Sequence, residues 1–273
     1  MKYLLLFLLF IGFFEIRAQH SFLPKPPKNI TFSHVIDSGT IRIMYVVNQF
    51  TENPKDSEDV HVLEIGENFS KYYSYNLFRR DSIYTYYLQK NPNAREVPDL
   101  FGRDITRNNR YFWSEYYKNY SQKTLSEYAY MPKNITNYQY TEPIQDFKWV
   151  IHEDTLTIAT YLCQKATCFF RGKNYTAWFC TNIPINEGPW KFEGLPGLIL
   201  KIYDDNCEYV FTCVSIELHR IKYPIIMYDY KNYKIIERIK LVKLWVDIFD
   251  HYYQMIGSTP WSRNLSYHSL ELK

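Results

Sequence analysis

Runs of alternating apolar and polar residues fill much of the chain and predict antiparallel β-strands. The first run spans 40–51, and two more, 60–65 and 69–75, are separated by a short connection that contains Gly66. Later runs of the same kind cover 124–131, 136–141, 147–152 and 158–170. The chain is therefore expected to be mainly β, an antiparallel meander that forms a curved sheet or half-barrel.

The stretch from 78 to 117 has no clean period. It is polar and rich in Arg and Tyr, and its local pattern favours a strand over 83–88 and a short helix near Trp113. The period changes again near Asn232, after which apolar residues recur at spacings of three and four as far as Met255. This pattern predicts one long C-terminal helix with a wide apolar face.

Two later hairpins can be aligned residue by residue. With a tight turn at Gly172-Lys173, Cys163 and Cys180 share one face as diagonal neighbours. Cys168 then points to the other face, and a disulfide between the first two stays an open possibility. In the next hairpin, a turn over 204–207 places 198–202 opposite 209–213. Their shared apolar face is expected to be the core, with Cys213 as a small buried residue.

Proline and glycine are concentrated between Pro184 and Gly197, which hold three of the nine Gly and three of the 13 Pro. Such a density specifies one backbone path, because Pro fixes φ and Gly adopts angles closed to other residues. The apolar residues of this loop should fold over an end or face of the sheet, either as a structural closure or as a binding lip. The candidate residues for a lip are Trp190, Phe192, Leu195 and Pro196.

A second candidate surface lies near this loop. Lys165 and Arg171 have the same parity on one predicted strand and are expected to share a face with Trp178, as a cationic and aromatic patch. A plain solvent-facing side of the sheet explains the same pattern. The basic first half of the C-terminal helix likewise fits either a solvated face or a contact with an anionic partner such as lipid head groups.

Composition and charge narrow the classes of function. The chain has 273 residues, 46% of them hydrophobic and 19% aromatic, which excludes a disordered chain. The formal net charge of +3 is too small for a nucleic-acid footprint. The sequence contains no GxSxG, HExxH, Walker or GxGxxG pattern, so we expect no cofactor and no metal, and we assign no catalytic residue.

The first residues resemble a secretory signal. Residues 1–18 combine Lys2, an apolar core and Ala18 at the expected cleavage point, and no other apolar run is long enough to span a membrane. We therefore expect a location in the periplasm or at the outer membrane or cell surface. Together with the strand and helix patterns, this predicts an antiparallel β domain over 19–217 and a helical extension over 218–273. All five cysteines lie in the second half of the mature chain, and their pairing is left open.

The hexapeptide Gly194-Leu-Pro-Gly-Leu-Ile199 lies in an ordered context that extends back through 183–184, 177–179, 170–173, 161–167 and 146–149. This segment resembles the GLPGLI family, secreted Bacteroidetes proteins of uncharacterised function. The resemblance implies no catalytic residue. The general pattern is also similar to half-barrels that bind lipid or lipoprotein chains in the envelope, although a shared fold does not by itself imply a shared function.

These observations favour a non-catalytic cell-envelope binding or assembly protein. Its ligand would be an apolar chain such as a lipid, a peptide, or a partner protein of the envelope. In the lipid-carrier version, the loop over 190–198 gates the opening and the C-terminal helix covers it. The alternatives are a secreted hydrolase whose site is built from distant loops, and a purely structural envelope protein with a filled core.

Overall fold

The computed structural model describes residues 28–31, 33–49, 58–94, 114–132, 134–255 and 269–271. Twelve strands form one sheet in the order β12-β6-β5-β4-β3-β2-β1-β11-β10-β9-β8-β7. All neighbouring pairs are antiparallel except β12 with β6. The predicted signal sequence, residues 1–18, lies outside the described residues.

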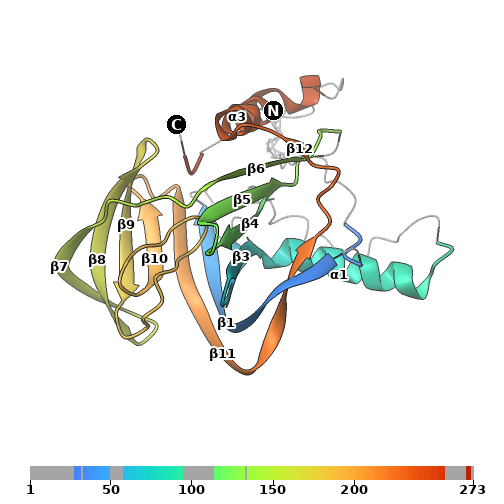
Figure 1. The fold of residues 1–273 in the computed structure, drawn as a ribbon. Helices are drawn as coiled ribbons and strands as arrows, with labels where there is room; N and C mark the ends of the chain where they lie inside the picture. Colours follow the sequence, from blue (N-terminus) through green and yellow to red (C-terminus); the bar gives the residue numbers. More distant parts are fainter. Residues whose placement is uncertain are drawn as a thin grey trace, which may run out of the picture.

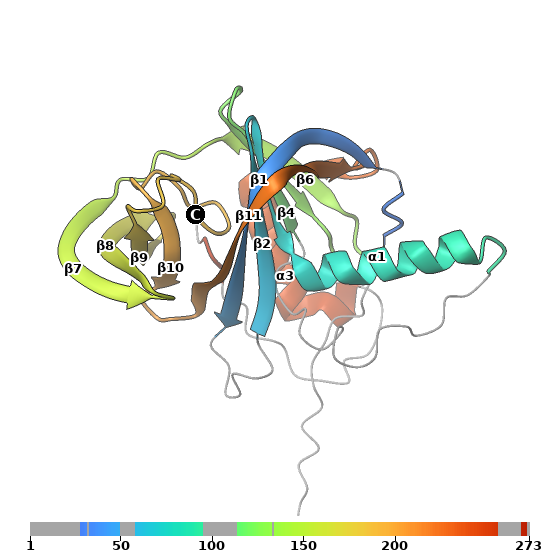
Figure 2. The same ribbon diagram turned by 90° about the horizontal axis from the view of Figure 1, so that it is seen from below.

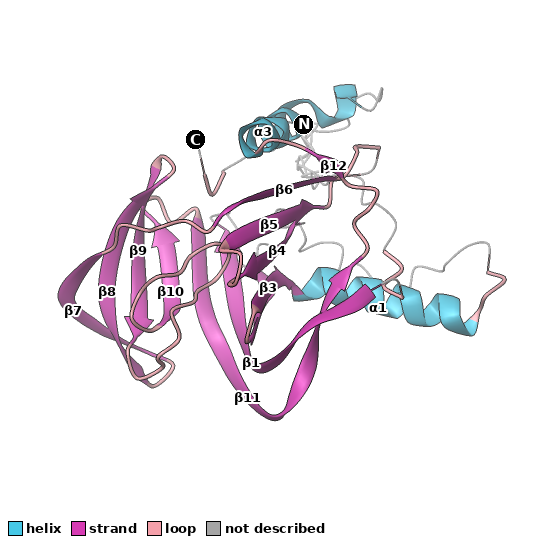
Figure 3. Cartoon of the chain, in the orientation of Figure 1, coloured by secondary structure: helices cyan, strands magenta, loops and turns pink. Residues whose placement is uncertain are grey.

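Strands make up most of the described chain, and the helices lie at its periphery (Figure 3). The strands are β1 (Ser33–Gln49), β2 (Glu58–Gly66), β3 (Phe69–Ser74), β4 (Ser114–Asn119), β5 (Thr124–Ala129), β6 (Tyr138–Pro143), β7 (Val150–Ile158), β8 (Tyr161–Phe170), β9 (Lys173–Cys180), β10 (Leu198–Asp204), β11 (Tyr209–Tyr228) and β12 (Lys234–Ile235). The helices are α1 (Tyr75–Lys90) and α3 (Arg238–Met255). The prediction of a mainly β fold with a long C-terminal helix is confirmed.

The paired strands β1 and β11 run through the middle of the sheet and bend sharply together (Figure 1). Their register shifts between Gly39 and Ile41, which is a bulge at the bend. The ring of Tyr223 packs on Gly39 so closely that a Cβ there would lie 2.7 Å from the ring. Tyr223 also donates a 2.5 Å hydrogen bond to the carbonyl of Ile41. A side chain at position 39 would therefore force the ring of Tyr223 to move.

The sheet has two parts with different partners. The strands β7 to β10 curl away from the rest, whereas α1 lies beside the part that holds β2 and β3 (Figure 2). The large hydrophobic core fills the space inside the curled strands and extends to Tyr45 and Tyr72. A smaller cluster joins Leu241 and Ile248 of α3 to Tyr140 of β6. At the free edge, β7 has a register shift between Ile151 and Thr155.

The helix α1 replaces the strand predicted over 83–88, so that prediction is wrong. Ser74 caps the helix, since its side chain accepts a 3.3 Å hydrogen bond from the backbone of Leu77. The buried face of α1 consists of Arg80, Asp81 and Thr85, not of apolar residues. An amphipathic helix with a polar inner face produces no apolar period, which explains the error. Trp113 lies outside the described residues.

The first hairpin has a different register from the predicted one. Phe170 pairs with Lys173, so the two-residue turn is Arg171-Gly172, with φ values of 47° and 91° that fit a primed turn. Cys168 was expected to face away from Cys163, yet both are buried in the same core cluster. All five cysteines are free thiols.

The second hairpin keeps its predicted buried face but not its register. Ile202 pairs with Phe211, two residues from the expected pairing. Cys213 is buried, as predicted. The boundary expected between 217 and 218 falls inside β11, whose pairing with β1 continues to Tyr228. The residues on either side of that boundary therefore belong to one sheet.

Candidate functional site

The loop between β9 and β10 folds its apolar residues into the interior. Trp190, Phe192 and Leu195 are at most 2% exposed and belong to the main core cluster. Pro196 is exposed at the surface of the loop. This geometry agrees with a structural closure, because the apolar side chains of a binding lip would have to face a ligand.

Glycine sets the path of this loop at two positions. A Cβ on Gly197 would lie 2.2 Å from the carbonyl oxygen of Cys180, so the backbones approach too closely for any side chain. Gly194 has a φ of +89°, a conformation that L-residues rarely adopt. Trp190 also has a positive φ, of 56°, and its ring is buried nonetheless. The Gly and Pro pattern therefore encodes a fixed backbone that inserts aromatic side chains.

A buried lysine from the other part of the sheet holds the loop. Lys118 of β4 donates hydrogen bonds to Oε2 of Glu187 at 2.7 Å and to the carbonyl of Phe192 at 3.3 Å. Its Nζ also lies 2.5 Å from the carboxylate of Glu193, and Tyr120 donates a 2.8 Å bond to Glu187. Burial disfavours the charged lysine, but the two carboxylates outweigh this and raise the pKa of Lys118.

A second buried lysine, Lys191, lies at the centre of the candidate site. It is 2% exposed and donates hydrogen bonds to Oη of Tyr140 at 2.6 Å and to Oε1 of Glu271 at 2.9 Å. Its Nζ lies 3.5 Å from Glu127. Glu127 in turn accepts hydrogen bonds from Ser114 and Tyr140, at 2.8 and 2.7 Å. Burial raises the pKa of Tyr140 well above its usual value, and the nearby carboxylates raise it further.

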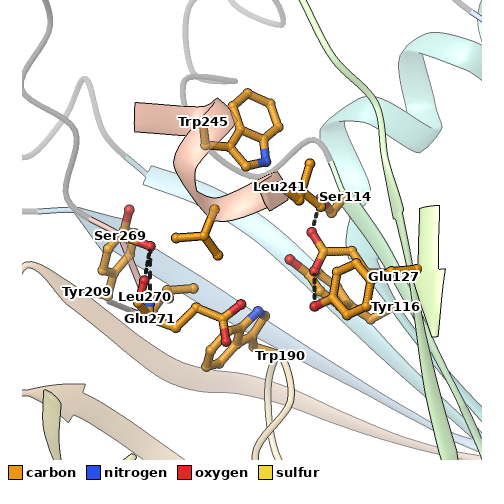
Figure 4. Close-up of a pocket in the computed structure, with 12 residues that line it drawn as sticks. Ser114, Tyr116, Glu127, Trp190, Tyr209, Leu241, Trp245, Ser269, Leu270 and Glu271 are labelled. Atoms are coloured by element: carbon orange, nitrogen blue, oxygen red, sulfur yellow. Dashed lines mark hydrogen bonds between the residues drawn. The ribbon is translucent and has the colours of Figure 1, made fainter. Parts of the chain in front are cut away.

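Figure 4 shows a small pocket of about 50 Å³. Its lining includes three residues that contact Lys191, namely Glu127, Tyr140 and Glu271. The segment Ser269–Glu271 lies on one side of it, and Ser114 and Glu127 lie on the other. Trp245 of α3 and Trp190 of the loop close the remaining sides. A cavity of this size holds only a few water molecules.

Two arginines extend the ionic network around Glu271. Arg171 pairs with the carboxylates of both Glu142 and Glu271, and Arg238 lies 3.3 Å from Glu271 and 3.8 Å from Glu142. Burial disfavours the ionised Glu271, but Lys191 and Arg171 outweigh it and lower its pKa. Around this pocket, the described residues thus contribute three cations and three carboxylates, which balance in charge.

The segment Ser269–Glu271 lies in the interior alongside this network. Leu270 is 6% exposed and belongs to the main core, and its carbonyl accepts a hydrogen bond from the hydroxyl of Tyr175. The hydroxyl of Ser269 bonds with the backbone of Glu271 at 2.5 and 3.2 Å. The site therefore holds this short segment of the chain through one apolar side chain, one backbone carbonyl and one carboxylate.

The predicted cationic and aromatic patch is only partly assembled. Lys165 pairs directly with Trp178, and Trp178 pairs on its other side with Lys201. The three residues alternate with buried Ala166, Ala177 and Ile202 and so lie on the outer face. Arg171 does not join them, because it lies in the turn after β8 and pairs with two interior carboxylates.

Sequence reasoning missed the central residues of this site. Glu127, Glu142 and Glu271 come from β5, β6 and a distant segment, and no spacing in the sequence connects them. Lys191 carried one usable signal, because it lies between Trp190 and Phe192 in an apolar loop. A lysine between two buried aromatic residues needs a buried acidic partner.

Residues 170–201 match a family model described as a protein of unknown function (Porph_ging), which is the GLPGLI family of uncharacterised Bacteroidetes proteins. The predicted resemblance to the GLPGLI family is confirmed over this segment. The match runs from the end of β8 through β9 and the loop between β9 and β10 into β10. It therefore includes Arg171, Glu187 and Lys191. No curated protein sequence matches the chain significantly.

Two solved structures, both titled as structures of PNGF-II, resemble the chain. In the P21 space group the TM-score is 0.46 with 14% identity, covering 76% of this chain and 33% of that one. In the C2 space group the TM-score is 0.45 with 14% identity, covering 76% and 32%. The chain thus spans about a third of the length of these structures.

Among the described helices, none is long and apolar enough to cross a membrane.

Proposed function

We propose that this chain is a non-catalytic binding or assembly protein of the cell envelope that recognises a peptide segment of a partner protein. The site is the pocket around Lys191, and the motif it recognises is an apolar residue followed by a carboxylate. The secretory signal expected over 1–18 supports the envelope location. The loop between β9 and β10 serves this site as a rigid wall.

The observation that carries the proposal is the position of Ser269–Glu271. Glu271 pairs with Lys191, Arg171 and Arg238, and Leu270 is buried in the core. Tyr175 supplies the backbone contact, by its hydrogen bond to the carbonyl of Leu270. Charge-assisted pairs with arginine are strong and directional, and backbone contacts tolerate different sequences, which together suit peptide recognition.

The same contacts argue against a catalytic role and against a role as a lipid carrier. The described cations and carboxylates around Lys191 are mutually paired, and the pocket of about 50 Å³ has no room for a substrate beside the bound segment. Trp190, Phe192 and Leu195 fill the core and do not line a channel for an acyl chain. A peptide that replaces the segment would preserve each of these pairings.

The test is competition between the internal segment and a free peptide. An attached segment acts at an effective concentration on the order of millimolar, so the unaltered chain should bind a labelled peptide of residues 264–273 weakly. In the Leu270→Ala variant the internal segment is loosened, and fluorescence anisotropy should show at least about 10-fold tighter binding. Adding Lys191→Met should abolish this gain.

Two controls keep the result interpretable. Glu237→Gln changes an exposed carboxylate near α3 and should leave peptide binding unchanged. A peptide with Gln in place of the residue equivalent to Glu271 should bind at least about 10-fold more weakly, since it lacks the charge. A folded Leu270→Ala variant that binds neither peptide would contradict the proposal.

A further inference from the structure

A larger cavity, of about 290 Å³, lies where α1 packs beside the bend of β1 and β11. It shares no lining residue with the pocket around Lys191. The lining combines four charged side chains with aromatic and aliphatic ones: Arg42, Glu64, Lys71, Glu217, Met44, Val62, Tyr73, Tyr75, Phe78, Pro224 and Ile226. A concave site with a few convergent polar groups is the usual form of a small-molecule site.

The charged groups of this cavity are incompletely satisfied by one another. Arg42 donates two hydrogen bonds to Oε1 of Glu64, at 3.2 and 2.9 Å. Its other terminal nitrogen, Nη1, lies 3.9 Å from Glu217, which is too far for a hydrogen bond. The hydrogen bonds and the ion pair of Glu64 with described residues all use its Oε1, and none of them uses Oε2. Oε2 of Glu217 is 3.3 Å from Nε2 of His219, which leaves its Oε1 for a further contact. Arg42 and one oxygen of each glutamate therefore retain hydrogen-bonding capacity for a ligand.

Lys71 adds a second cation deep in the wall. It is 1% exposed and donates a 3.1 Å hydrogen bond to the carbonyl of Ile226. Its nearest carboxylate, Glu115 at 3.5 Å, is held more closely by Lys28 at 2.7 Å. Burial, aided by the charge of Lys28, lowers the pKa of Lys71 despite Glu115. An additional anion near Lys71 would stabilise its charged form.

The rest of the lining is apolar and aromatic. Tyr75 and Phe78 come from α1, and their rings lie 6.5 Å apart. Tyr73 packs edge-on against Phe78 at 5.6 Å, while its hydroxyl donates to Glu64. The cavity thus places two cations and two carboxylates next to an aromatic wall.

We propose that this cavity binds a small zwitterion, an amino acid with an apolar side chain. Its carboxylate would pair with Arg42 and Lys71, and its ammonium group with Glu64 and Glu217. Its side chain would pack on Phe78 and the neighbouring aromatic residues. The two glutamates would repel a purely anionic ligand, and Arg42 and Lys71 would repel a purely cationic one. Only a ligand with both charges therefore matches the site.

Isothermal titration of the full mature chain with L-leucine and L-phenylalanine tests the proposal. We expect saturable binding of at least one of them. The amide of the amino acid that binds lacks the carboxylate, and the N-acetyl derivative lacks the ammonium group. Each derivative should bind at least about 10-fold more weakly than the amino acid itself. Absence of binding by both amino acids at millimolar concentration would overturn the proposal, as would equal binding of the amide.

Variants locate the binding in this cavity. Arg42→Met and Glu217→Gln should each weaken binding at least about 10-fold, while Arg220→Met, an exposed change on the same strand as Glu217, should leave it unchanged. Unaltered binding by a folded Arg42→Met protein would place the ligand elsewhere and refute the assignment. Lys191→Met should not affect amino-acid binding, so failure of this site is distinguishable from failure of the peptide site.

Discussion

Lys118 of β4 donates a 2.7 Å hydrogen bond to Glu187, in the loop between β9 and β10. These strands are far apart in the sheet order, so the ion pair joins the two parts of the sheet across the interior. Both side chains are almost fully buried. A buried pair of this kind adds little stability relative to apolar residues, but losing one partner leaves the other charge uncompensated.

Replacing the lysine of this pair should therefore destabilise the fold strongly. We expect Lys118→Met to lower the free energy of unfolding by about 3–5 kcal/mol, because Glu187 and Glu193 would remain buried without their cation. Urea denaturation followed by tryptophan fluorescence measures the change. Lys201→Met, on the outer face, should change it by less than about 0.5 kcal/mol. Equal effects of the two substitutions would contradict the assigned role.

Two glycines of the loop should respond differently to alanine. Gly197→Ala introduces a Cβ 2.2 Å from a backbone oxygen and should cost more than about 3 kcal/mol or prevent folding. At Gly194 the nearest atoms to a Cβ belong to Trp149 at 3.9 Å and beyond, so only the positive φ opposes alanine there. Gly194→Ala should cost about 1–2 kcal/mol. Thermal denaturation of both variants tests the order, and the reverse order would show that the close approach is misplaced.

Stability should fall at acidic pH because of Glu115. Burial opposes its ionisation, but Lys28 and Lys71 outweigh this and lower its pKa from 4.5 to about 2. A carboxyl with a lowered pKa stabilises the fold fully above its unfolded value, so this contribution is lost as the pH falls from about 4.5 towards 2. A shift of this size corresponds to stability on the order of 3 kcal/mol.

Denaturation at several pH values checks this prediction. The difference in unfolding free energy between the unaltered chain and Glu115→Gln should be large at pH 7 and should shrink as the pH falls below 4.5. Glu67→Gln, at an exposed carboxylate, is the control and should show little difference at any pH. A difference that stays constant down to pH 3 would mean that Glu115 titrates normally.

Thiol reactivity should distinguish one cysteine from the other four. Cys207 is exposed, whereas burial raises the pKa of Cys163 to about 11 and of Cys168 and Cys213 to about 12. At pH 8 a disulfide reagent should therefore modify one thiol of the native protein rapidly and the rest only after unfolding. Cys207→Ser should remove the fast phase. Rapid reaction of more than one thiol would show that the core opens easily.

The sequence predicted strands such as β5, whose burial alternates along the strand. It missed β4, in which five consecutive residues are buried and no period of two is present. It also predicted the aromatic loop, since the density of Pro and Gly and the residues Trp190 and Phe192 are local signals. The predicted register of both hairpins was off by two residues. In the first hairpin the turn lies at Arg171-Gly172, where a non-glycine residue has a positive φ. In the second, Ile202 pairs with Phe211. The helix α1 was missed because Arg80, Asp81 and Thr85 form its buried face.

The central ionic network had no sequence signature for a different reason. Arg171 and Glu271 are 100 residues apart, and Lys191 and Tyr140 are 51 apart. Long-range pairs of this kind depend on the sheet order, which periodicity does not determine. Arg171 illustrates the point, because its parity with Lys165 suggested the outer face, whereas the turn directs it to Glu142 and Glu271.

The register shift of β7 also bears on how copies of the protein meet. As the last strand of an open sheet, β7 presents unpaired backbone groups, and Val150 is 58% exposed there. The shift interrupts regular pairing between Ile151 and Thr155, where the exposed carboxylates of Glu153 and Asp154 project. An incoming strand would meet a kinked, negatively charged edge, and two such edges repel each other. The irregularity thus protects the sheet from edge-to-edge aggregation.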